Sequence, residues 1–273
     1  MTPARHALRD AAARFAFSPT ARLDAELLLA HALGITRERL LLTLDDQPVP
    51  PGFAALVDRR ARHEPVAYIT GTRAFWTIDL LVGPGALVPR ADSETLLDAA
   101  VAHFAGRAAP RRILDLGTGP GTLLLAALDE WPAAEGWGVD ASPDALVWAH
   151  RNAAALGMTE RSHFVIGNWA SGIDARFDLV LANPPYIERD AALPDEVIGY
   201  EPRTALFAGA DGLDDYRAIA VQLGALFAPG ALACVEIGAT QGQSAADLFR
   251  AQGLSVTVRR DLGDRDRCLV VTA

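Results

Sequence analysis

Residues 113–121 read Ile-Leu-Asp-Leu-Gly-Thr-Gly-Pro-Gly, so an apolar stretch runs directly into three glycines at alternate positions. The apolar stretch is typical of a buried strand, and residues 121–128 have the composition of a helix. Glycines between a strand and a helix let the backbone approach a bound molecule closely, because they carry no Cβ. The stretch therefore predicts an α/β fold with a ligand-binding turn at the carboxyl end of this strand.

Strands and helices alternate through the chain that follows. The expected strands are 112–116, 136–140, 163–166, 177–182, 231–237, 254–258 and 267–272. The expected helices are 121–128, 143–156, 212–226 and 242–251. This alternation predicts a doubly wound, mostly parallel sheet of seven strands. Because the polar loop 259–266 is too short for a parallel crossover, we expect the last strand to be antiparallel.

The first 90 residues have a different pattern. Residues 1–64 are expected to be helical, with a helix that ends at Gly34 and another over about 52–63. Residues 68–71 and 74–82 are rich in β-formers and predict a β-hairpin. We therefore expect a helical domain at 1–64, a β-hairpin linker at 65–90 and the α/β domain at 91–273.

The helical segment also differs in charge. Residues 1–64 contain 9 Arg and 8 acidic residues, whereas the remainder contains 16 Arg and 26 acidic residues. A helical segment whose net charge differs from that of the rest of the chain suits a domain that recognises a partner or acts as a lid. A purely structural N-terminal extension fits the composition equally well, and the residues alone leave both interpretations open.

Composition excludes several function classes. The 273 residues are 51% hydrophobic, which is typical of a globular protein. All 25 basic residues are Arg, so mechanisms that need a Walker lysine or a Schiff-base lysine are excluded. The net charge of −9 argues against broad, non-specific binding to nucleic acid.

Cysteine usage and hydropathy point to a soluble protein without a metal. Cys234 and Cys268 lie in apolar stretches and have no neighbours at metal-ligand spacing, so we expect two buried thiols and no metal site. The most apolar window, 221–235, is interrupted by Pro229 and Gly230. We expect no membrane span and a cytoplasmic location.

The residues after the glycine turn suggest a nucleoside ligand. The spacing is G-x-G-x-G, not the G-x-G-x-x-G of dinucleotide sites, and Asp140 ends the next strand, where an acid can accept both hydroxyls of a ribose. Asn168 and Trp169 follow the third strand and could accept from an adenine amino group and cover the ring. The alternatives are a tight structural turn and ordinary loop residues.

The fourth expected strand ends in Asn183-Pro184-Pro185-Tyr186. Two prolines make the loop stiff and leave few N–H donors, so the Asn183 side-chain oxygen and the Pro184 carbonyl remain as acceptors. Two converging acceptors suit a planar NH₂ group, and Tyr186 could stack on it. In an open α/β sheet this strand end is expected to lie beside the glycine turn.

These motifs resemble those of a known family. The Asn-Pro-Pro-Tyr signature is shared by class I S-adenosylmethionine-dependent methyltransferases that modify planar amino or amide nitrogens. Further motifs resemble the peptide chain release factor glutamine methyltransferases, over nearly the whole chain. They are Glu64-Pro65-Val66-Ala67-Tyr68-Ile69-Thr70-Gly71, Phe75-Trp76, Val88-Pro89-Arg90-Ala91-Asp92-Ser93-Glu94, Tyr200-Glu201-Pro202, Asp211-Gly212-Leu213 and Val235-Glu236-Ile237-Gly238.

The resemblance implies methyl transfer from S-adenosylmethionine to the side-chain amide nitrogen, N5, of the glutamine in the Gly-Gly-Gln motif of class I peptide chain release factors. It implies that the cofactor is held by Gly117, Thr118, Gly119, Pro120, Gly121, Asp140, Asn168, Trp169 and Asn183. The glutamine amide would be held by Asn183, Pro184, Pro185 and Tyr186. The partner would be the release factor, with no membrane or nucleic-acid partner, and we expect a monomer because that partner is itself a large protein.

Three residues depart from the pattern of many relatives, which have Ser or Thr at Pro120, Thr at Ser93 and Asp at Asn168. Pro120 removes one N–H from the loop and Asn168 removes a charge, so both could alter cofactor affinity. Neither change affects the expected chemistry.

Three other functions fit the sequence less well. A glutamine methyltransferase of a ribosomal protein has a similar chain, but the motifs at 64–94 favour the release factor enzyme. An RNA or DNA amino-methyltransferase is disfavoured by the acidic balance. A cofactor-binding scaffold without catalysis is disfavoured by the intact glycine and Asn-Pro-Pro-Tyr loops.

Overall fold

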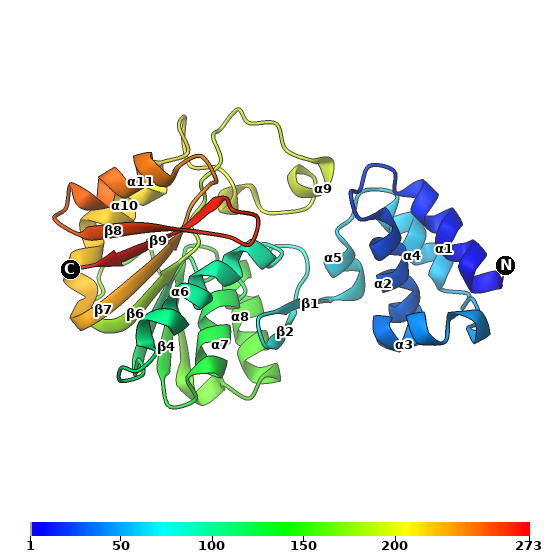
Figure 1. Cartoon of the computed structure of the whole chain (residues 1–273), viewed down its shortest axis with the longest axis horizontal. Helices are drawn as coiled ribbons and strands as arrows, with labels where there is room; N and C mark the ends of the chain where they lie inside the picture. The colour runs from blue at the N-terminus through cyan, green and yellow to red at the C-terminus, as the bar shows by residue number, and fades with distance from the viewer. Residues whose placement is uncertain (1) are drawn as a thin grey trace. The chain divides into compact units, whose positions relative to one another are not determined.

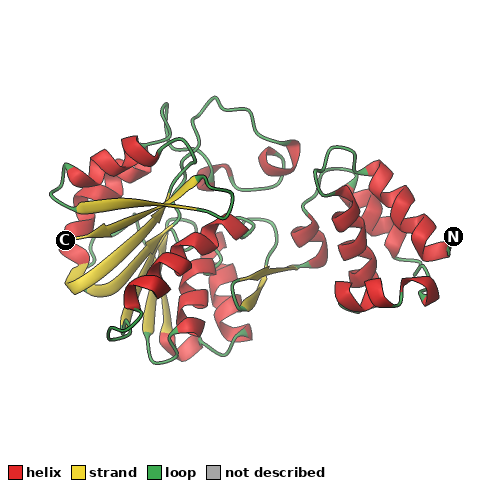
Figure 2. Cartoon of the chain, in the orientation of Figure 1, coloured by secondary structure: helices red, strands yellow, loops and turns green. Residues whose placement is uncertain are grey.

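The computed structural model describes residues 2–273, which form two compact units. The smaller unit contains the residues up to Thr72 together with Leu193–Tyr200. The larger unit contains Arg73–Ala192 and Glu201–Ala273. Figure 2 shows that helices make up the smaller unit, whereas the larger unit holds a sheet covered by helices.

The smaller unit is a helical bundle with its own core. Its helices are α1 (Pro3–Arg14), α2 (Ala21–Leu33), α3 (Arg37–Leu42), α4 (Phe53–Arg60), α5 (Val66–Thr70) and the short α9 (Asp195–Ile198), with a 3₁₀ turn, η1, at Leu44–Asp46. As expected, α2 ends at Gly34, which takes the left-handed conformation with φ of 66°. Leu8, Phe15, Leu28 and Leu29 are fully buried where α1 packs on α2.

The expected hairpin is wrong in detail. Residues 68–71 are not a strand: Val66–Thr70 form α5, with Tyr68 and Ile69 buried, and Gly71 ends the helix with φ of 78°. Burial against the helical core outweighs the β-propensity of these residues. The hairpin consists of β1 (Thr72–Phe75) and β2 (Ile78–Leu81), and the expected strand 74–82 is divided by a turn in which Trp76 has φ of 53°.

Seven strands form the sheet of the larger unit (Figure 1). They are β3 (Arg112–Leu116), β4 (Glu135–Asp140), β5 (Ser162–Ile166), β6 (Phe177–Ala182), β7 (Phe227–Glu236), β8 (Ser255–Arg260) and β9 (Asp266–Thr272). Their order is β5-β4-β3-β6-β7-β9-β8, with parallel pairing from β5 to β7 and β9 antiparallel to both of its neighbours. The predicted doubly wound sheet with an antiparallel last strand is confirmed.

The strand order places a topological switch point between β3 and β6. The chain runs outward from β3 through β4 to β5 and then returns to the other side of β3. Leu116 pairs with Ala182 as the last residue of each strand. Because both strands are parallel, the glycine turn and the Asn183 loop leave the sheet at the same edge, where α/β folds bind ligands.

Helices cover both faces of the sheet. α6 (Glu94–Phe104), α7 (Thr122–Glu130) and α8 (Pro143–Ala155) lie on one face, and α10 (Asp214–Leu223) and α11 (Gly242–Arg250) lie on the other (Figure 1). α6 follows a 3₁₀ turn, η2 (Ala91–Ser93), and was not among the expected helices, although Leu96, Leu97 and Ala100 recur at helical spacing. It packs on β7 and β9.

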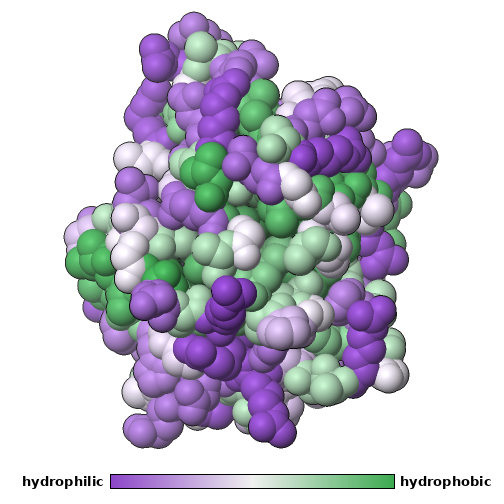
Figure 3. Space-filling model, turned by 90° about the vertical axis from the view of Figure 1, so that its left-hand side faces the viewer, coloured by the Kyte–Doolittle hydropathy of each residue, from purple (hydrophilic) through white to green (hydrophobic). Residues whose placement is uncertain are grey.

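Buried apolar residues form one core around the sheet and a separate core in the helical unit. Cys234 on β7 and Cys268 on β9 are buried free thiols, as predicted. On the face drawn in Figure 3, hydrophilic residues surround a central region of weakly hydrophobic ones. Within residues 2–273 no helix has the length and apolar character needed to cross a bilayer, and no group of His, Cys, Asp or Glu has the arrangement of a metal site.

Candidate active site

The glycine turn after β3 depends on left-handed backbone. Gly117, Gly119 and Gly121 have φ of 70°, 56° and 83°, a region that side chains with a Cβ disfavour. A Cβ on Gly117 would lie 3.1 Å from the Trp169 ring, and one on Gly121 would lie 2.9 Å from Leu125. The turn therefore needs glycine for backbone conformation and for close packing.

Backbone bonds tie this turn to β4. The N–H groups of Gly117 and Thr118 both donate to the Val139 carbonyl, at 2.8 and 2.9 Å. At the end of β4, Asp140 accepts from the Gly119 N–H at 2.7 Å and from the Ser142 N–H at 2.8 Å. A carboxylate has about four acceptor positions, so Asp140, which lines the pocket, can still accept from a ligand hydroxyl.

Asp115 is a site residue that the sequence analysis did not assign. It is 1% exposed, and its Oδ2 accepts from the Thr118 hydroxyl at 2.7 Å and from the Leu124 N–H at 3.3 Å. Its Oδ1 has no hydrogen-bond partner among residues 2–273. Burial raises the pKa of this carboxyl to about 7. The signal in the sequence was an acid inside an otherwise apolar strand.

Asn168 and Trp169 follow β5 and line the same pocket. Trp169 has φ of 51°, and its ring lies over Gly117. Burial, with the charge of Asp214 next in effect, raises the pKa of the half-buried Asp215 of α10, and the neighbouring Trp169 side chain opposes that rise. Asp215 and Trp169 both line the pocket, so α10 borders the site on the side of the ring that covers the glycine turn.

The Asn183 loop is held by residues from distant parts of the chain. The Asn183 Nδ2 donates to the Ser93 hydroxyl at 3.2 Å, and the Tyr186 hydroxyl donates to Glu236 Oε1 at 3.2 Å. Gln241 Nε2 donates to the Tyr186 carbonyl at 3.0 Å. Burial, with the charge of Glu236 next in effect, raises the pKa of the Tyr186 phenol, so it remains protonated and can donate.

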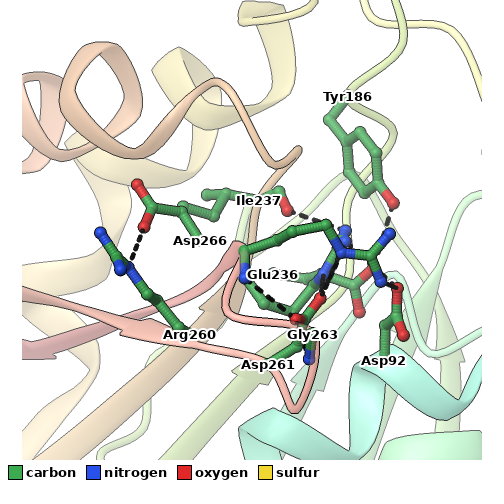
Figure 4. Close-up of polar contacts among 10 residues, drawn as sticks. Asp92, Tyr186, Glu236, Ile237, Arg260, Asp261, Gly263 and Asp266 are labelled. Atoms are coloured by element: carbon green, nitrogen blue, oxygen red, sulfur yellow. Dashed lines mark hydrogen bonds and ion pairs between the residues drawn. The ribbon is translucent and has the colours of Figure 1, made fainter.

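A polar cluster lies beneath the loop. Figure 4 shows the Tyr186 ring pointing toward Glu236, Asp92 and Asp261. The buried guanidinium of Arg267 lies 3.1 Å from Asp92 Oδ2 and 3.3 Å from Asp261 Oδ2, and it donates to the Ile237 carbonyl at 3.3 Å. The cluster joins η2, the end of β7 and the β8–β9 turn.

One pocket of about 620 Å³ brings both loops together. We call its two parts the glycine-loop end (Gly117, Thr118, Gly119, Pro120, Asp140) and the Asn183 end (Arg90, Ser93, Asn183, Pro185, Phe207). Its size is within the range of small-molecule sites.

Of the predicted site residues, Gly121, Pro184 and Tyr186 are not part of the lining. Arg90, Ser93 and Phe207 belong to the lining but were not predicted as site residues, although Arg90 and Ser93 lie in a family motif.

Comparison with known proteins agrees with the fold. A model described as "PrmC N-terminal domain" matches residues 6–71, and one described as "Methyltransferase small domain" matches residues 92–198. The chain is also similar to the structure of a ribosomal protein L11 methylase from Lactobacillus delbrueckii subsp. bulgaricus. The TM-score is 0.50 at 18% identity, over 70% of this chain and 83% of that one.

Two relatives cover most of both sequences. The release factor glutamine methyltransferase of Rhodospirillum rubrum is 44% identical over 91% of this chain and 78% of its own length. That of Cereibacter sphaeroides is 45% identical over 97% of this chain and 96% of its own length. At this identity and coverage, the chain belongs to the family of release factor glutamine methyltransferases.

Proposed function

We propose that the protein transfers a methyl group from S-adenosylmethionine to the side-chain amide nitrogen of the glutamine in the Gly-Gly-Gln motif of class I peptide chain release factors. One observation carries the proposal. The Leu116–Ala182 pair ends β3 and β6 together, so the glycine turn and the Asn183 loop line one pocket. A methyl donor at one loop and a planar amide at the other would then face each other.

The residues at the glycine-loop end fit the cofactor. Asp115 Oδ1 is a buried acceptor without a donor among residues 2–273, which suits an ammonium group. The missing Cβ of Gly117 leaves space under the Trp169 ring, and Asp140 retains acceptor positions for a ribose. In this assignment Gly117 to Pro120 hold the methionine part, Asp140 the ribose, and Asn168 with Trp169 the adenine.

The Asn183 end would orient the acceptor. S-adenosylmethionine supplies a methyl that its sulfonium charge already activates. An amide nitrogen is a weak nucleophile because its lone pair is delocalised, so alignment of nitrogen and methyl is the main task, and orientation of this kind can be worth up to roughly 7–11 kcal/mol. Asn183 Oδ1 and the Pro184 carbonyl would accept from the amide NH₂, and these bonds strengthen as positive charge develops on nitrogen. We expect the proton to leave late, without a strong general base.

The helical unit would recognise the protein substrate. It contains not only the N-terminal helices but also Leu193–Tyr200, a segment of the loop that begins at Asn183. The buried Arg60 pairs with Asp24 at 2.8 Å and with Glu196 at 2.7 Å, and the Tyr200 hydroxyl donates to the Arg62 carbonyl at 2.7 Å. The substrate role of this unit, the linker role of residues 65–90, the monomeric state, the absence of a nucleic-acid partner and the cytoplasmic location remain predictions.

Mass spectrometry tests the proposal directly. Unmethylated release factor is incubated with this protein and S-adenosylmethionine, and the same reaction with Asn183→Ala is the control. One added methyl on the Gly-Gly-Gln glutamine, absent in the control, is the expected result. Transfer to a ribosomal protein or to RNA instead, with the release factor unmodified, would contradict the proposed substrate and retain the fold.

A further inference from the structure

One side chain outside the pocket binds the end of the Asn183 loop. Gln241 immediately precedes α11 and is not among the residues that line the pocket. Its Nε2 donates to the Tyr186 carbonyl at 3.0 Å and to the Gly212 carbonyl at 3.3 Å. Its Oε1 accepts from the Gly238 N–H at 3.0 Å, and the Tyr216 hydroxyl lies 3.3 Å from the same oxygen. A single amide group therefore joins the Asn183 loop to three other segments of the larger unit.

The partners of the Gln241 amide determine which way it faces. A carbonyl oxygen can only accept and a backbone N–H can only donate, so Nε2 belongs with Tyr186 and Gly212 and Oε1 belongs with Gly238. The Gln241 backbone N–H also donates to the Gly238 carbonyl at 2.9 Å, which closes the turn between β7 and α11. The turn thus fixes the base of the side chain, and the hydrogen bonds fix its end.

Two glycines give the amide its space. A Cβ on Gly212, which has φ of 68°, would clash with the Tyr186 carbonyl oxygen and lie 2.8 Å from Gln241 Nε2. A Cβ on Gly238 would lie 2.7 Å from Gln241 Oε1. These glycines belong to the motifs Asp211-Gly212-Leu213 and Val235-Glu236-Ile237-Gly238, which the proposed methyl transfer leaves without a role. Close packing around Gln241 gives both motifs one physical function.

The Asn183 loop is short and stiff between two fixed ends. At its start, Ala182 is paired with β3 in the sheet. At its end, the Tyr186 carbonyl is held by Gln241. The two prolines between these ends have a fixed φ, so few backbone torsions remain free. The position of the Tyr186 carbonyl therefore restricts where the Asn183 side chain and the Pro184 carbonyl can lie.

We propose that Gln241 is a positioning residue for methyl transfer, which holds the Tyr186 carbonyl so that Asn183 Oδ1 and the Pro184 carbonyl converge on the acceptor nitrogen. Gln241 does not line the pocket and acts only through Tyr186, which lies 55 positions earlier in the chain. The inference rests on the proposed glutamine methylation and extends it to a residue outside the Asn-Pro-Pro-Tyr motif.

Gln241→Glu and Gln241→Met test the donated hydrogen bonds. A carboxylate has the shape of the amide but no proton to donate, and the methionine side chain has a similar length and no donor. We expect each variant to lower kcat roughly 10- to 100-fold, as loss of donors to partly buried carbonyls does. The Kd for S-adenosylmethionine, which also reports folding, and the KM for the release factor should change less than about three-fold. Retention of kcat within two-fold in Gln241→Met would overturn the proposal.

Gln243→Glu is the matched control. It makes the same substitution two residues further along α11, where the exposed Gln243 side chain donates only to Asp247, at 2.7 Å, among residues 2–273. We expect it to retain kcat within about two-fold. Equal losses of kcat in Gln243→Glu and Gln241→Glu would overturn the proposal, because the added charge on α11 would then explain both.

Gly238→Ala disturbs the amide without changing Gln241 itself. Because the new methyl would lie 2.7 Å from Gln241 Oε1, we expect a loss of kcat of roughly 10-fold. In a Gln241→Ala background the methyl no longer meets the amide, so the same change should cost less than about two-fold more. Equal fold losses in the two backgrounds would overturn the proposal, since Gly238 would then act independently of Gln241.

A second measurement separates this inference from the proposed function. The chemical shifts of the Asn183 side-chain amide, measured by ¹⁵N NMR without a protein substrate, should change in Gln241→Met and stay unchanged in Gln243→Glu. Identical Asn183 shifts in the wild type and in Gln241→Met would overturn the proposal. If the wild type failed to methylate a release factor, the proposed function would fall, and the shifts would still decide whether Gln241 positions Asn183.

Discussion

The two ends of the pocket are built in different ways. At the glycine-loop end, Gly117 and Thr118 bond to Val139, and Gly119 bonds to Asp140, so one turn and one strand end supply the geometry. At the Asn183 end, Asn183 depends on Ser93 and Tyr186 depends on Glu236, partners that are 90 and 50 residues away in the chain. The geometry of the glycine-loop end is thus determined mainly by local backbone conformation. The Asn183 end exists only once the sheet and η2 have come together.

The largest expected effect lies at the Asn183 end. Asn183→Ala should lower kcat by roughly 100- to 1000-fold, by analogy with loss of one positioned partner of a transition state. Cofactor affinity should change much less, because the glycine-loop end remains intact. Single-turnover kinetics and calorimetric titration with S-adenosylmethionine test both statements. If kcat stayed within a factor of three, Asn183 would not hold the acceptor amide.

The second expected effect in order of size is a pH dependence of the free energy of unfolding. It involves one buried carboxyl near each end of the pocket. The pKa of the Asp115 carboxyl rises from 3.8 to about 7 in the folded protein because of burial. The folded state then holds this proton more tightly, so its contribution to stability is complete below about pH 4 and is lost as the pH rises through 7. A shift of this size corresponds to a loss on the order of 4 kcal/mol over the full pH range.

Asp115→Asn should remove part of this pH dependence. Urea unfolding of the wild type should show a falling free energy of unfolding between pH 5 and 8, and the variant should show a smaller fall. Glu236, whose pKa also rises to about 7, should account for a remaining slope in Asp115→Asn. An unchanged slope would mean that Asp115 ionises in the folded state as it does in the unfolded chain.

A smaller effect is expected from Gly117→Ala at the glycine-loop end. A left-handed alanine costs about 1–2 kcal/mol, and the new Cβ would lie 3.1 Å from the Trp169 ring. Cofactor affinity measured by calorimetry should fall roughly 10-fold. Gly106→Ala is the matched control, since Gly106 has φ of 75° and open space around its Cβ position, and it does not line the pocket. Equal losses of affinity in both variants would contradict a local role for Gly117.

The smallest effect is expected from Asn168→Asp. Asn168 lines the pocket, and an adenine amino group needs only an acceptor, which both side chains supply. The Kd for S-adenosylmethionine should therefore change less than about three-fold at neutral pH. A change of more than ten-fold in a calorimetric titration would show that position 168 contacts a different part of the cofactor.

Prediction from the sequence succeeded where local pattern controls structure. The strands β3 and β6 have the expected bounds, and Gly117, Gly119 and Gly121 adopt the left-handed conformation that only glycine accepts easily. It failed where tertiary contacts overrode local preference. Tyr68 and Ile69 are β-formers that became helical because the helical core buries them.

The missed site residues share one property. Ser93, Asp115 and Glu236 are buried polar side chains whose partners are set by the fold, and a sequence pattern does not show which donor meets which acceptor. The association of Leu193–Tyr200 with the helical unit was missed for the same reason, because its ion pairs join residues more than 100 positions apart.

The sequence by itself therefore determined the α/β class, the glycine turn and the acceptor-rich Asn183 loop, because backbone conformation and strand order follow from glycine, proline and hydrophobic spacing. Only the tertiary structure decided which atoms of those loops face the ligand. The Asn183 side chain bonds to Ser93 of η2, and the Trp169 ring packs against Gly117 of the glycine turn. The physical reason is that a hydrogen bond depends on distance and direction between two groups, and folding brings those groups together from separate elements.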